Sequence, residues 1–497
     1  MPESIRAMIV ILACYGAIFW LFSKPISTII STVEYSRWRN IWLVMTITAF
    51  LSPDFWIFAV IVTLILFLFG PKQPEQRIIY YLFLLCVLPI LSSDIPGFAG
   101  INYIFKLSYP RLLTFILLVP LLFLTKQFVP HNLRLFRLPT DWFAVTFILL
   151  WAILGFRDTT ITDGLRNAFI LFVDTLIPYY VISRYLHSLD QFTRAFAALL
   201  IAITILSLIG IFEAAKHWHL YHIIMQKLSD YSMGYGDRSG ILRASAIFTS
   251  PIILGYVLMI GFGILLYLRP LIEWRFQFYL IAFILMLGIL ATISRGPWVG
   301  FAALCMTYIL TGREKIKNLT LSILSFMLMF PFLFLTKFGD KFLDLLPFVG
   351  TTAAHTVSYR EQLFDNAWIV ILRNPYFGSM TYNQTPEMES MRQGQGIIDL
   401  VNTYIKITLE TGLIGVALFV TIFSTLIFGT YKTIKILPSD EVDMIRLGRV
   451  LIAILVGIIV TIGTVSTIDH VPIFYWAFIA ITASYIHLAK QIIYESR

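Results

Sequence analysis

Charged residues are scarce in this chain: Asp, Glu, Lys and Arg make up 13% of its 497 residues, whereas 58% are hydrophobic. So few charges cannot cover the surface of a soluble protein of this length, which excludes an ordinary water-soluble globular fold. Only three cysteines are present, and all lie inside apolar runs. Cysteines in such surroundings act as small apolar residues, so a disulfide framework is not expected.

Acidic residues are also few, at 28 against 37 basic ones, which gives a net charge of +9. A basic balance can indicate nucleic-acid binding, but Lys and Arg at the cytoplasmic ends of helices are what membrane insertion itself requires. We therefore expect membrane lipid, and no nucleic acid, as a partner.

The apolar residues are gathered in segments of mostly 14 to 19 residues. A helix needs about 20 residues, interfacial ends included, to cross a hydrocarbon core of about 30 Å. The expected fold is an all-α polytopic membrane protein with about 12–15 transmembrane helices and one large periplasmic loop that contains short amphipathic helices. The apolar segments are 8–22, 41–51, 55–69, 78–91, 111–125, 142–155, 168–182, 195–212, 252–268, 276–293, 297–310, 318–336, 412–429, 450–466 and 473–488.

The distribution of Lys and Arg predicts the orientation, because basic residues in short loops stay cytoplasmic. Alternate loops from 23–40 to 430–449, together with the tail 489–497, hold 21 of the 37 basic residues. Placing these loops inside puts the two longest polar stretches, about 213–250 and 337–411, in the periplasm. We therefore expect a multi-pass membrane protein whose two longest polar stretches face the periplasm.

The pattern of apolar and polar segments divides the chain into four parts. We expect an N-terminal transmembrane bundle at 1–194, transmembrane helices with periplasmic arginine motifs at 195–336, the large periplasmic loop at 337–411 and C-terminal transmembrane helices at 412–497.

Two arginine motifs lie on the predicted periplasmic side, where the positive-inside rule gives no reason for them. Arg238 and Arg243 precede the span at 252–268, and Arg295 lies in a tight hairpin between two spans. An isolated arginine at a membrane edge can be a snorkelling anchor. Arg295, however, must satisfy five donors with nothing in its local sequence to pair with, so it needs a distant carboxylate or an anionic ligand.

Two further stretches lie beyond the hairpin. Apolar residues recur at helical spacing from 363 to 371, which predicts a short amphipathic helix that ends at Asn374-Pro375 and carries Arg360 in its first turn. Asp399 and Asn402 share a face if a helix begins there, or Asp399 is its N-cap. Glu410 then lies close to the bilayer, where a carboxylate is costly without a cationic partner.

Taken in order, these motifs resemble the bacterial O-antigen ligase/polymerase superfamily. The resemblance rests on the Ser-Arg-Gly hairpin at 294–296, the Ser-x-Arg…Asn-Pro-x-x-Gly stretch at 358–378 and the Asn-x-Tyr…Glu-x-Gly-x-x-Gly entry into the next span at 402–415. It covers roughly residues 195–430 and surrounds one large periplasmic loop.

The resemblance implies a metal-independent, inverting glycosyltransferase that needs no cofactor and acts on an undecaprenyl-pyrophosphate-linked oligosaccharide. Arginines at the periplasmic mouth would hold the pyrophosphate, a role that suits a planar fork binding phosphate oxygens in pairs. The resemblance gives this role to Arg295 first, then to Arg243 and Arg360. The implied partners are the lipid-linked donor, a glycan acceptor and a chain-length regulator.

The residues expected at the site form two groups. The catalytic candidates are Arg295, Asp399 and Arg360; the substrate-binding candidates are Arg243, Arg238, Asn402, Tyr404, Glu410 and His355.

One position departs from the family. Its ligases usually carry a histidine just before the Asn of the last motif, and here that position is Val401. Valine cannot accept a proton, so Asp399 takes the role of base, or His355 or His470 reaches the site from elsewhere, or no strong base is needed. The absence favours polymerisation of glycan repeat units into a surface polysaccharide over ligation to lipid A-core or protein.

A protein of another class, a transporter or flippase for the same lipid-linked sugar, would carry its charges midway through spans. Here the arginines lie at one mouth, which favours an enzyme. His217, His219 and His222 do not converge on one helical face, so no metal site is expected.

Overall fold

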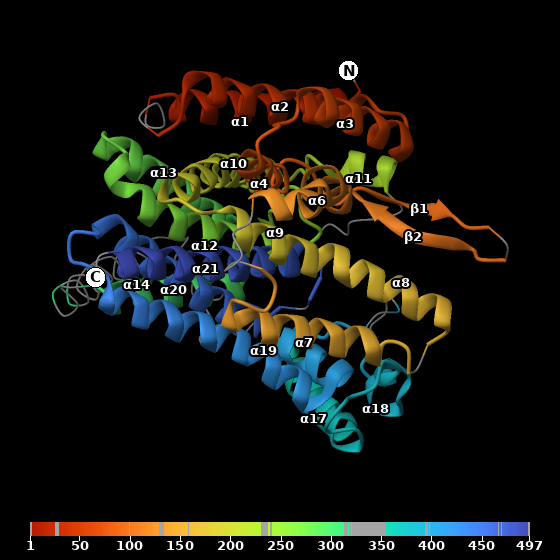
Figure 1. The fold of residues 1–497 in the computed structure, drawn as a ribbon. Helices are drawn as coiled ribbons and strands as arrows, with labels where there is room; N and C mark the ends of the chain where they lie inside the picture. Colours follow the sequence, from red (N-terminus) through yellow and green to blue (C-terminus); the bar gives the residue numbers. More distant parts are fainter. Residues whose placement is uncertain are drawn as a thin grey trace.

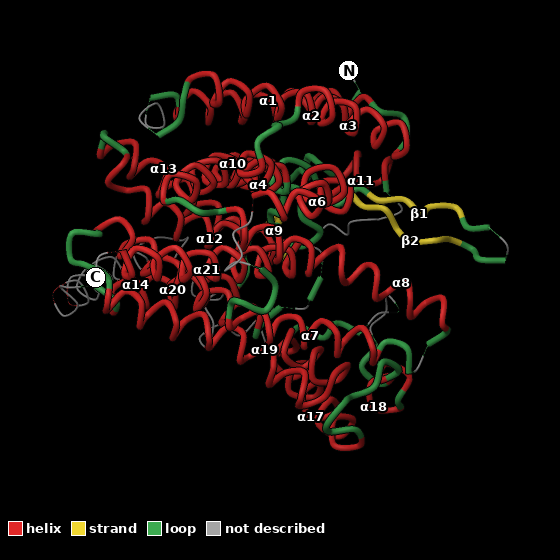
Figure 2. The backbone as a smooth tube through the Cα atoms, in the orientation of Figure 1, coloured by secondary structure: helices red, strands yellow, loops and turns green. Residues whose placement is uncertain are grey.

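The protein folds as a set of long helices that run side by side (Figure 1, Figure 2). The strands of the described residues pair in two short β-ribbons. The computed structural model describes residues 2–495 except 25–28, 99, 129–133, 158, 230–236, 239–240, 313–316, 318–319, 321–353, 393–395, 397, 466 and 469. The predicted segment 318–336 therefore lies almost wholly outside the described residues, and each of the other apolar segments overlaps a described helix.

The first half of the chain contains the elements α1 (Glu3–Phe22), α2 (Thr32–Leu51), α3 (Phe55–Phe69), α4 (Pro74–Leu84), β1 (Ser92–Pro96), β2 (Tyr103–Ser108), α5 (Tyr109–Leu113), η1 (Thr114–Leu118), α6 (Val119–Phe128), α7 (Pro139–Leu154), α8 (Ile161–Leu171), η3 (Phe172–Leu176), α9 (Ile177–Tyr185), α10 (Leu189–Lys216) and α11 (His222–Leu228). The second half contains β3 (Asp237–Arg238), β4 (Ile241–Leu242), α12 (Pro251–Leu268), η4 (Arg269–Leu271), α13 (Arg275–Ala291), α14 (Arg295–Leu310), α17 (Ala354–Arg373), η6 (Tyr382–Gln384), α18 (Pro386–Glu389), α19 (Thr403–Ile436), α20 (Val442–Ile462) and α21 (His470–Glu495).

Seven of the described helical stretches are long and apolar enough to cross a membrane, and four shorter apolar helices accompany them. This architecture confirms the all-α polytopic membrane protein; the count of twelve to fifteen spans stays a prediction. The seven stretches begin at Glu3, Ile161, Leu189, Pro251, Thr403, Val442 and His470.

The centre of the bundle is formed by α10, α12 and α21. In α10 and α21, 83% of the apolar window is buried inside the protein, against 33% in α19. A helix that is apolar on every side and covered on every side belongs to the core, whereas α19 leaves one side for lipid. Ser188 and Gln191 form a capping box that starts α10, and Ser250 caps α12 ahead of Pro251.

Helices α14 and α20 approach closely through small residues. A side chain at Gly296 or at Gly300 would overlap the hydroxyls of Thr464 and Thr461, so only glycine fits at this contact. Close backbone approach through small residues is how helices associate in lipid, where burial of apolar surface gives little driving force.

The sequence reasoning did not predict the hairpin of β1 and β2. The strands pair antiparallel, Ser92 opposite Ser108 and Asp94 opposite Lys106, with an irregularity between Asp94 and Pro96. In Figure 1 the hairpin projects beyond the helix ends, on the side away from the C-terminus and on the same side as α17 and α18. By the predicted orientation this is the periplasmic side.

Candidate functional site

The structure brings Arg243 against the hairpin that carries Arg295. The Arg243 guanidinium donates from Nη2 to the Ser294 hydroxyl at 2.9 Å and from Nε to the Thr292 carbonyl at 3.4 Å. The Ala244 amide extends this contact by donating to the Ala291 carbonyl at 3.1 Å. Two arginine motifs that are fifty residues apart in the chain thus meet at one mouth of the bundle.

A buried carboxylate fixes the segment that holds Arg243. Glu213, fully buried near the end of α10, accepts the backbone N–H groups of Ser245 at 3.1 Å and of Ala246 at 2.9 Å. By accepting two backbone N–H groups, the carboxylate satisfies them inside the protein and holds the loop against α10. The sequence reasoning missed Glu213; an acidic residue at the end of an otherwise apolar span was the signal available.

Glu213 also contacts one of the three clustered histidines, His219. His219 is buried, and its Nδ1 lies 3.3 Å from Glu213 Oε2, in the loop that follows α10. Among the described residues, no group of three or more His, Cys, Asp and Glu side chains could hold a metal ion.

Helix α19 begins one residue later than Asn402, and Asn402 is its cap. The Asn402 side chain accepts the N–H groups of Tyr404 at 2.8 Å and Ile405 at 3.2 Å. Asp399 instead accepts the Val401 N–H at 3.3 Å in a turn where Val401 has a φ of +28°. The interpretation of Asp399 as the N-cap was therefore wrong, because the chain makes one more turn before the helix starts.

Three other candidates lie around this entry. Tyr404 donates its hydroxyl to the Ile459 carbonyl at 2.9 Å and so ties α19 to α20. Arg360 is exposed on α17, which ends at Arg373, just before the predicted Asn374-Pro375 stop. The side chains of Arg238 and His355 lie outside the part of the chain that the structure describes. His470 is buried at the start of α21 with its ring centroid 4.8 Å from that of Phe248.

The Asn-Pro-x-x-Gly and Glu-x-Gly stretches meet backbone to backbone. Helix α19 is broken at Gly412, which has φ +71° and ψ −171°. The break frees the Leu409 carbonyl to accept the Ser379 N–H at 2.7 Å and the Leu413 N–H to donate to the Pro375 carbonyl at 2.7 Å. The two motifs are thus one structural unit that docks the end of the large loop onto α19.

Replacing Gly412 with alanine should destabilise the protein. A Cβ at this position would overlap the Tyr376 carbonyl, and these backbone angles are open essentially to glycine alone. The strained angles cost about 1–3 kcal/mol before any overlap is counted. We expect a lower thermal unfolding midpoint in detergent, whereas Gly16→Ala, where the Cβ has nothing within 4 Å, should unfold like the wild type. Equal midpoints for the two variants would contradict this account of the kink.

A cavity of about 720 Å³ opens beside this unit. Its charged lining consists of Lys106, Arg111, Asp174, Lys406 and Glu410, and its aromatic lining of Trp151, Tyr475 and Trp476. Only Glu410 among these was a candidate from the sequence. Much of the remaining lining comes from the β-ribbon, α5, α7, α8, η3 and α21, which are far apart in the chain.

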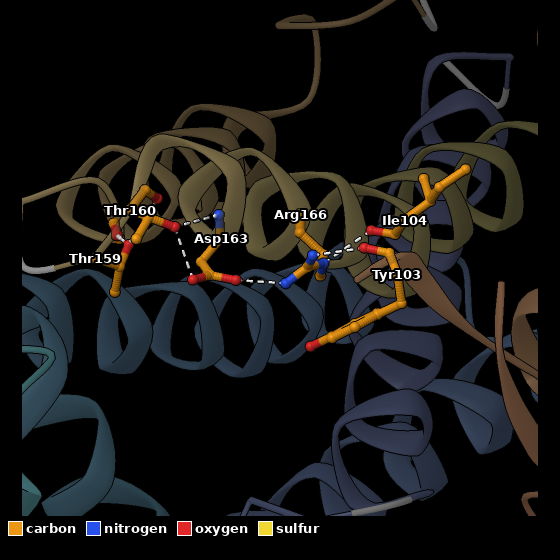
Figure 3. A network of polar contacts seen from close by, with 7 residues as sticks. Tyr103, Ile104, Thr159, Thr160, Asp163 and Arg166 are labelled. Atoms are coloured by element: carbon orange, nitrogen blue, oxygen red, sulfur yellow. Dashed lines mark hydrogen bonds and ion pairs between the residues drawn. The ribbon is translucent and has the colours of Figure 1, made fainter. Parts of the chain in front are cut away.

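The hairpin beside the cavity is held by Arg166. Its guanidinium donates to the carbonyls of Tyr103 at 2.6 Å and Ile104 at 2.8 Å, pairs with Asp163 and lies 3.8 Å from the centre of the Tyr103 ring (Figure 3). Thr160 caps α8 and bonds the same carboxylate at 2.8 Å. The first turn of α8 thus fixes strand β2, which supplies Lys106 to the cavity.

The segment between α20 and α21 connects the arginine mouth with the cavity. Thr464 packs against Gly296 on one side. On the other side, the Lys406 ammonium donates to the Thr467 carbonyl at 3.3 Å, and Thr403 donates to the Val465 carbonyl at 2.9 Å. The two features are therefore neighbours, separated by a few residues of backbone.

Part of the chain matches a known protein family. Residues 280–420, from α13 to the first half of α19, match the family described as O-antigen ligase. Over these residues the chain is similar to O-antigen ligases. The match contains Arg295, Arg360 and Glu410, and it confirms the predicted resemblance to the O-antigen ligase/polymerase superfamily. No curated protein matches the chain. Most of the cavity wall lies outside the matched residues.

Proposed function

We propose that the protein is a glycosyltransferase that polymerises polyprenyl-pyrophosphate-linked glycan repeat units into a surface polysaccharide at the periplasmic face of the inner membrane. Membership of the superfamily supports a role in polysaccharide assembly. The observation that carries the proposal is the contact between the Arg243 guanidinium and Ser294, which brings Arg243 against the hairpin that carries Arg295 at one end of the bundle.

The chemistry follows from that contact. An acceptor hydroxyl attacks the anomeric carbon, the bond to the pyrophosphate oxygen breaks, and negative charge grows on the leaving group. Preorganised guanidinium groups stabilise such charge most effectively where water is excluded. Direct displacement of this kind inverts the anomeric configuration and needs no metal, since the arginines supply the positive charge.

Polymerisation is preferred to ligation because Val401 stands where the ligases of the family usually have histidine. The acceptor of a polymerase is another glycan, and a chain-length regulator would be a partner of such an enzyme. The test is an in vitro reaction of purified protein with a lipid-linked repeat unit. A ladder of products that differ by one repeat supports polymerisation, and transfer of one finished chain to lipid A-core or protein would indicate ligation.

The orientation is testable at Ser390, which is exposed next to α18. The basic-residue distribution places 337–411 in the periplasm. A cysteine introduced at Ser390 should therefore react with an impermeant thiol reagent in cells whose outer membrane alone is permeabilised. Native Cys14 and Cys86 are buried and serve as the internal control. Labelling only after lysis of the inner membrane would reverse the orientation and the proposed mechanism with it.

A further inference from the structure

Membrane insertion does not explain the basic residues that line the cavity. Lys106, Arg111 and Lys406 are all among the sixteen basic residues that the predicted orientation leaves on the periplasmic side. Ionisable groups that membrane insertion does not require can mark a site for a polar ligand or a proton. A cavity of about 720 Å³ whose wall combines charged and aromatic side chains has the size and the lining of a small-ligand site.

The two carboxylates of the cavity differ in their surroundings. Asp174 is held by Arg111 through two parallel bonds, Nε to Oδ1 at 3.0 Å and Nη2 to Oδ2 at 2.8 Å. A bidentate pair of this kind occupies both oxygens of the carboxylate. Asp174 therefore serves to orient Arg111 at the cavity wall.

The backbone around this pair is itself unusual. Asp174 lies in the π-helical segment η3, and Arg111 lies just before a second one, η1. Single π-helical turns inside helices occur frequently at functional sites, because they re-aim a side chain that a regular helix would direct elsewhere. The segment η3 lines the cavity through Asp174 and Thr175, which is an independent indication of function.

Among the described residues, no arginine is paired with Glu410 as Arg111 is paired with Asp174. The cation that acts on Glu410 is Lys406, one turn earlier in α19, and the Trp151 indole donates to its carboxylate. The Tyr382 phenol lies near enough that the Glu410 charge adds to burial in raising the pKa of Tyr382. The carboxylate thus faces the cavity between one cation and the side chains of two amphipathic aromatic residues.

We propose that the cavity binds the acceptor sugar and that Glu410 is the general base that takes the proton from the attacking hydroxyl. The inference rests on the proposed function and names the residue that fills the role left open by Val401. Trp151 is a positioning residue for the carboxylate, and Arg111, held by Asp174, faces the glycan.

The proposed reaction is a displacement at the anomeric carbon of the donor. The acceptor oxygen forms a bond to the anomeric carbon of the polyprenyl-pyrophosphate donor, and the proton of that hydroxyl passes to Glu410. The bond from the anomeric carbon to the pyrophosphate oxygen breaks, and its electron pair leaves with the pyrophosphate at the arginine mouth. Glu410 then returns the proton to water before the next cycle.

Asp399 is the competing base. Its carboxylate accepts the Val401 N–H within its own turn and so contributes to the local backbone before α19. It is also absent from the cavity lining, whereas Glu410 and Lys406 are both part of it. The geometry therefore favours Glu410.

The test is chain extension by the purified full-length protein with a polyprenyl-pyrophosphate repeat unit. Glu410→Gln keeps the size of the side chain and an acceptor for Trp151, and should lower turnover by about 10²–10⁴ with donor binding within about twofold of wild type. Glu389→Gln makes the same change at an exposed glutamate paired with Arg392 on α18 and should extend chains normally. Formate should restore part of the turnover of Glu410→Ala, an effect that a merely structural glutamate would not show.

These assays distinguish a failure of the proposed function from a failure of the inference about Glu410. A wild-type protein that extends no lipid-linked glycan overturns the proposed function. An active wild type beside a Glu410→Gln variant of near-normal rate overturns the inference alone, as does a large loss in Asp399→Asn without one in Glu410→Gln. If the glutamine variant does not fold, formate rescue of the alanine variant decides, and loss of folded protein in both assigns Glu410 to stability and overturns the proposal.

Discussion

Replacing Arg295 with lysine should lower the rate of chain extension by about 10²–10³, although the protein should still insert and accumulate. Lysine keeps the positive charge and can still snorkel to the membrane edge, but it gives up the planar fork that binds two phosphate oxygens at once. The loss should appear in turnover more than in donor binding, since the charge on the leaving oxygen is greatest in the transition state.

The matched control is Arg275→Lys. Arg275 is exposed at the first residue of α13, at the end of that helix opposite the Arg295 hairpin, in a loop predicted to be cytoplasmic. It should tolerate lysine with an unchanged rate. Normal polymer from Arg295→Lys at normal protein level would make Arg295 a membrane anchor. Arg295→Ala is less informative, because the alanine could also disturb the hairpin.

The helices were predictable because a membrane span needs one property, an apolar stretch of sufficient length, and that property is local in sequence. The hairpin at 92–108 was not. Its strands have five and six residues and carry Ser92, Asp94 and Lys106, so they give no signal in a search for long apolar runs. Such a ribbon is specified by the partners it meets in the folded protein, chiefly the carbonyl contacts of Arg166.

The candidate site was likewise predictable from the sequence only in part. Motif order and charge predicted that Arg243 and Arg295 lie on one side of the membrane, and the contact of Arg243 with Ser294 agrees with that prediction. The pairing of Arg111 with Asp174 joins residues 63 positions apart, neither of which belongs to a motif. The cavity they line was thus beyond sequence reasoning, which found no special feature in the first third of the chain apart from its hydropathy.

The helix start at Asn402 shows how local ambiguity is resolved. Asp and Asn are about equally good caps, so the sequence alone could not show that the cap is Asn402 and not the predicted Asp399. In the folded chain the Thr403 hydroxyl donates to the Val465 carbonyl at 2.9 Å, which holds the first residue of α19 against the segment that follows α20.

The largest effect on stability should come from Asp141→Ala. Asp141 and Arg184 form an ion pair that is fully buried, with both side chains at 0% exposure, and Asp141 also accepts the Tyr179 hydroxyl at 2.7 Å and the Leu138 N–H at 3.2 Å. Removing the carboxylate leaves a guanidinium inside the protein without its counter-ion. Such a change typically costs about 3–5 kcal/mol, so we expect a much lower thermal unfolding midpoint, or little folded protein.

Asp163→Ala is the control that separates burial from charge. Asp163 also lies in the first turn of a helix and also pairs with an arginine, but 47% of its side chain is exposed. Its partner Arg166 keeps two backbone carbonyls after the change, and an exposed pair contributes about 0–1 kcal/mol. If both alanine variants unfold alike, the buried pair contributes no more than the exposed one. Replacing both partners together, as Asp141→Leu with Arg184→Met, should recover part of the loss, because the cost lies in the unpaired charge and is absent when no charge is buried.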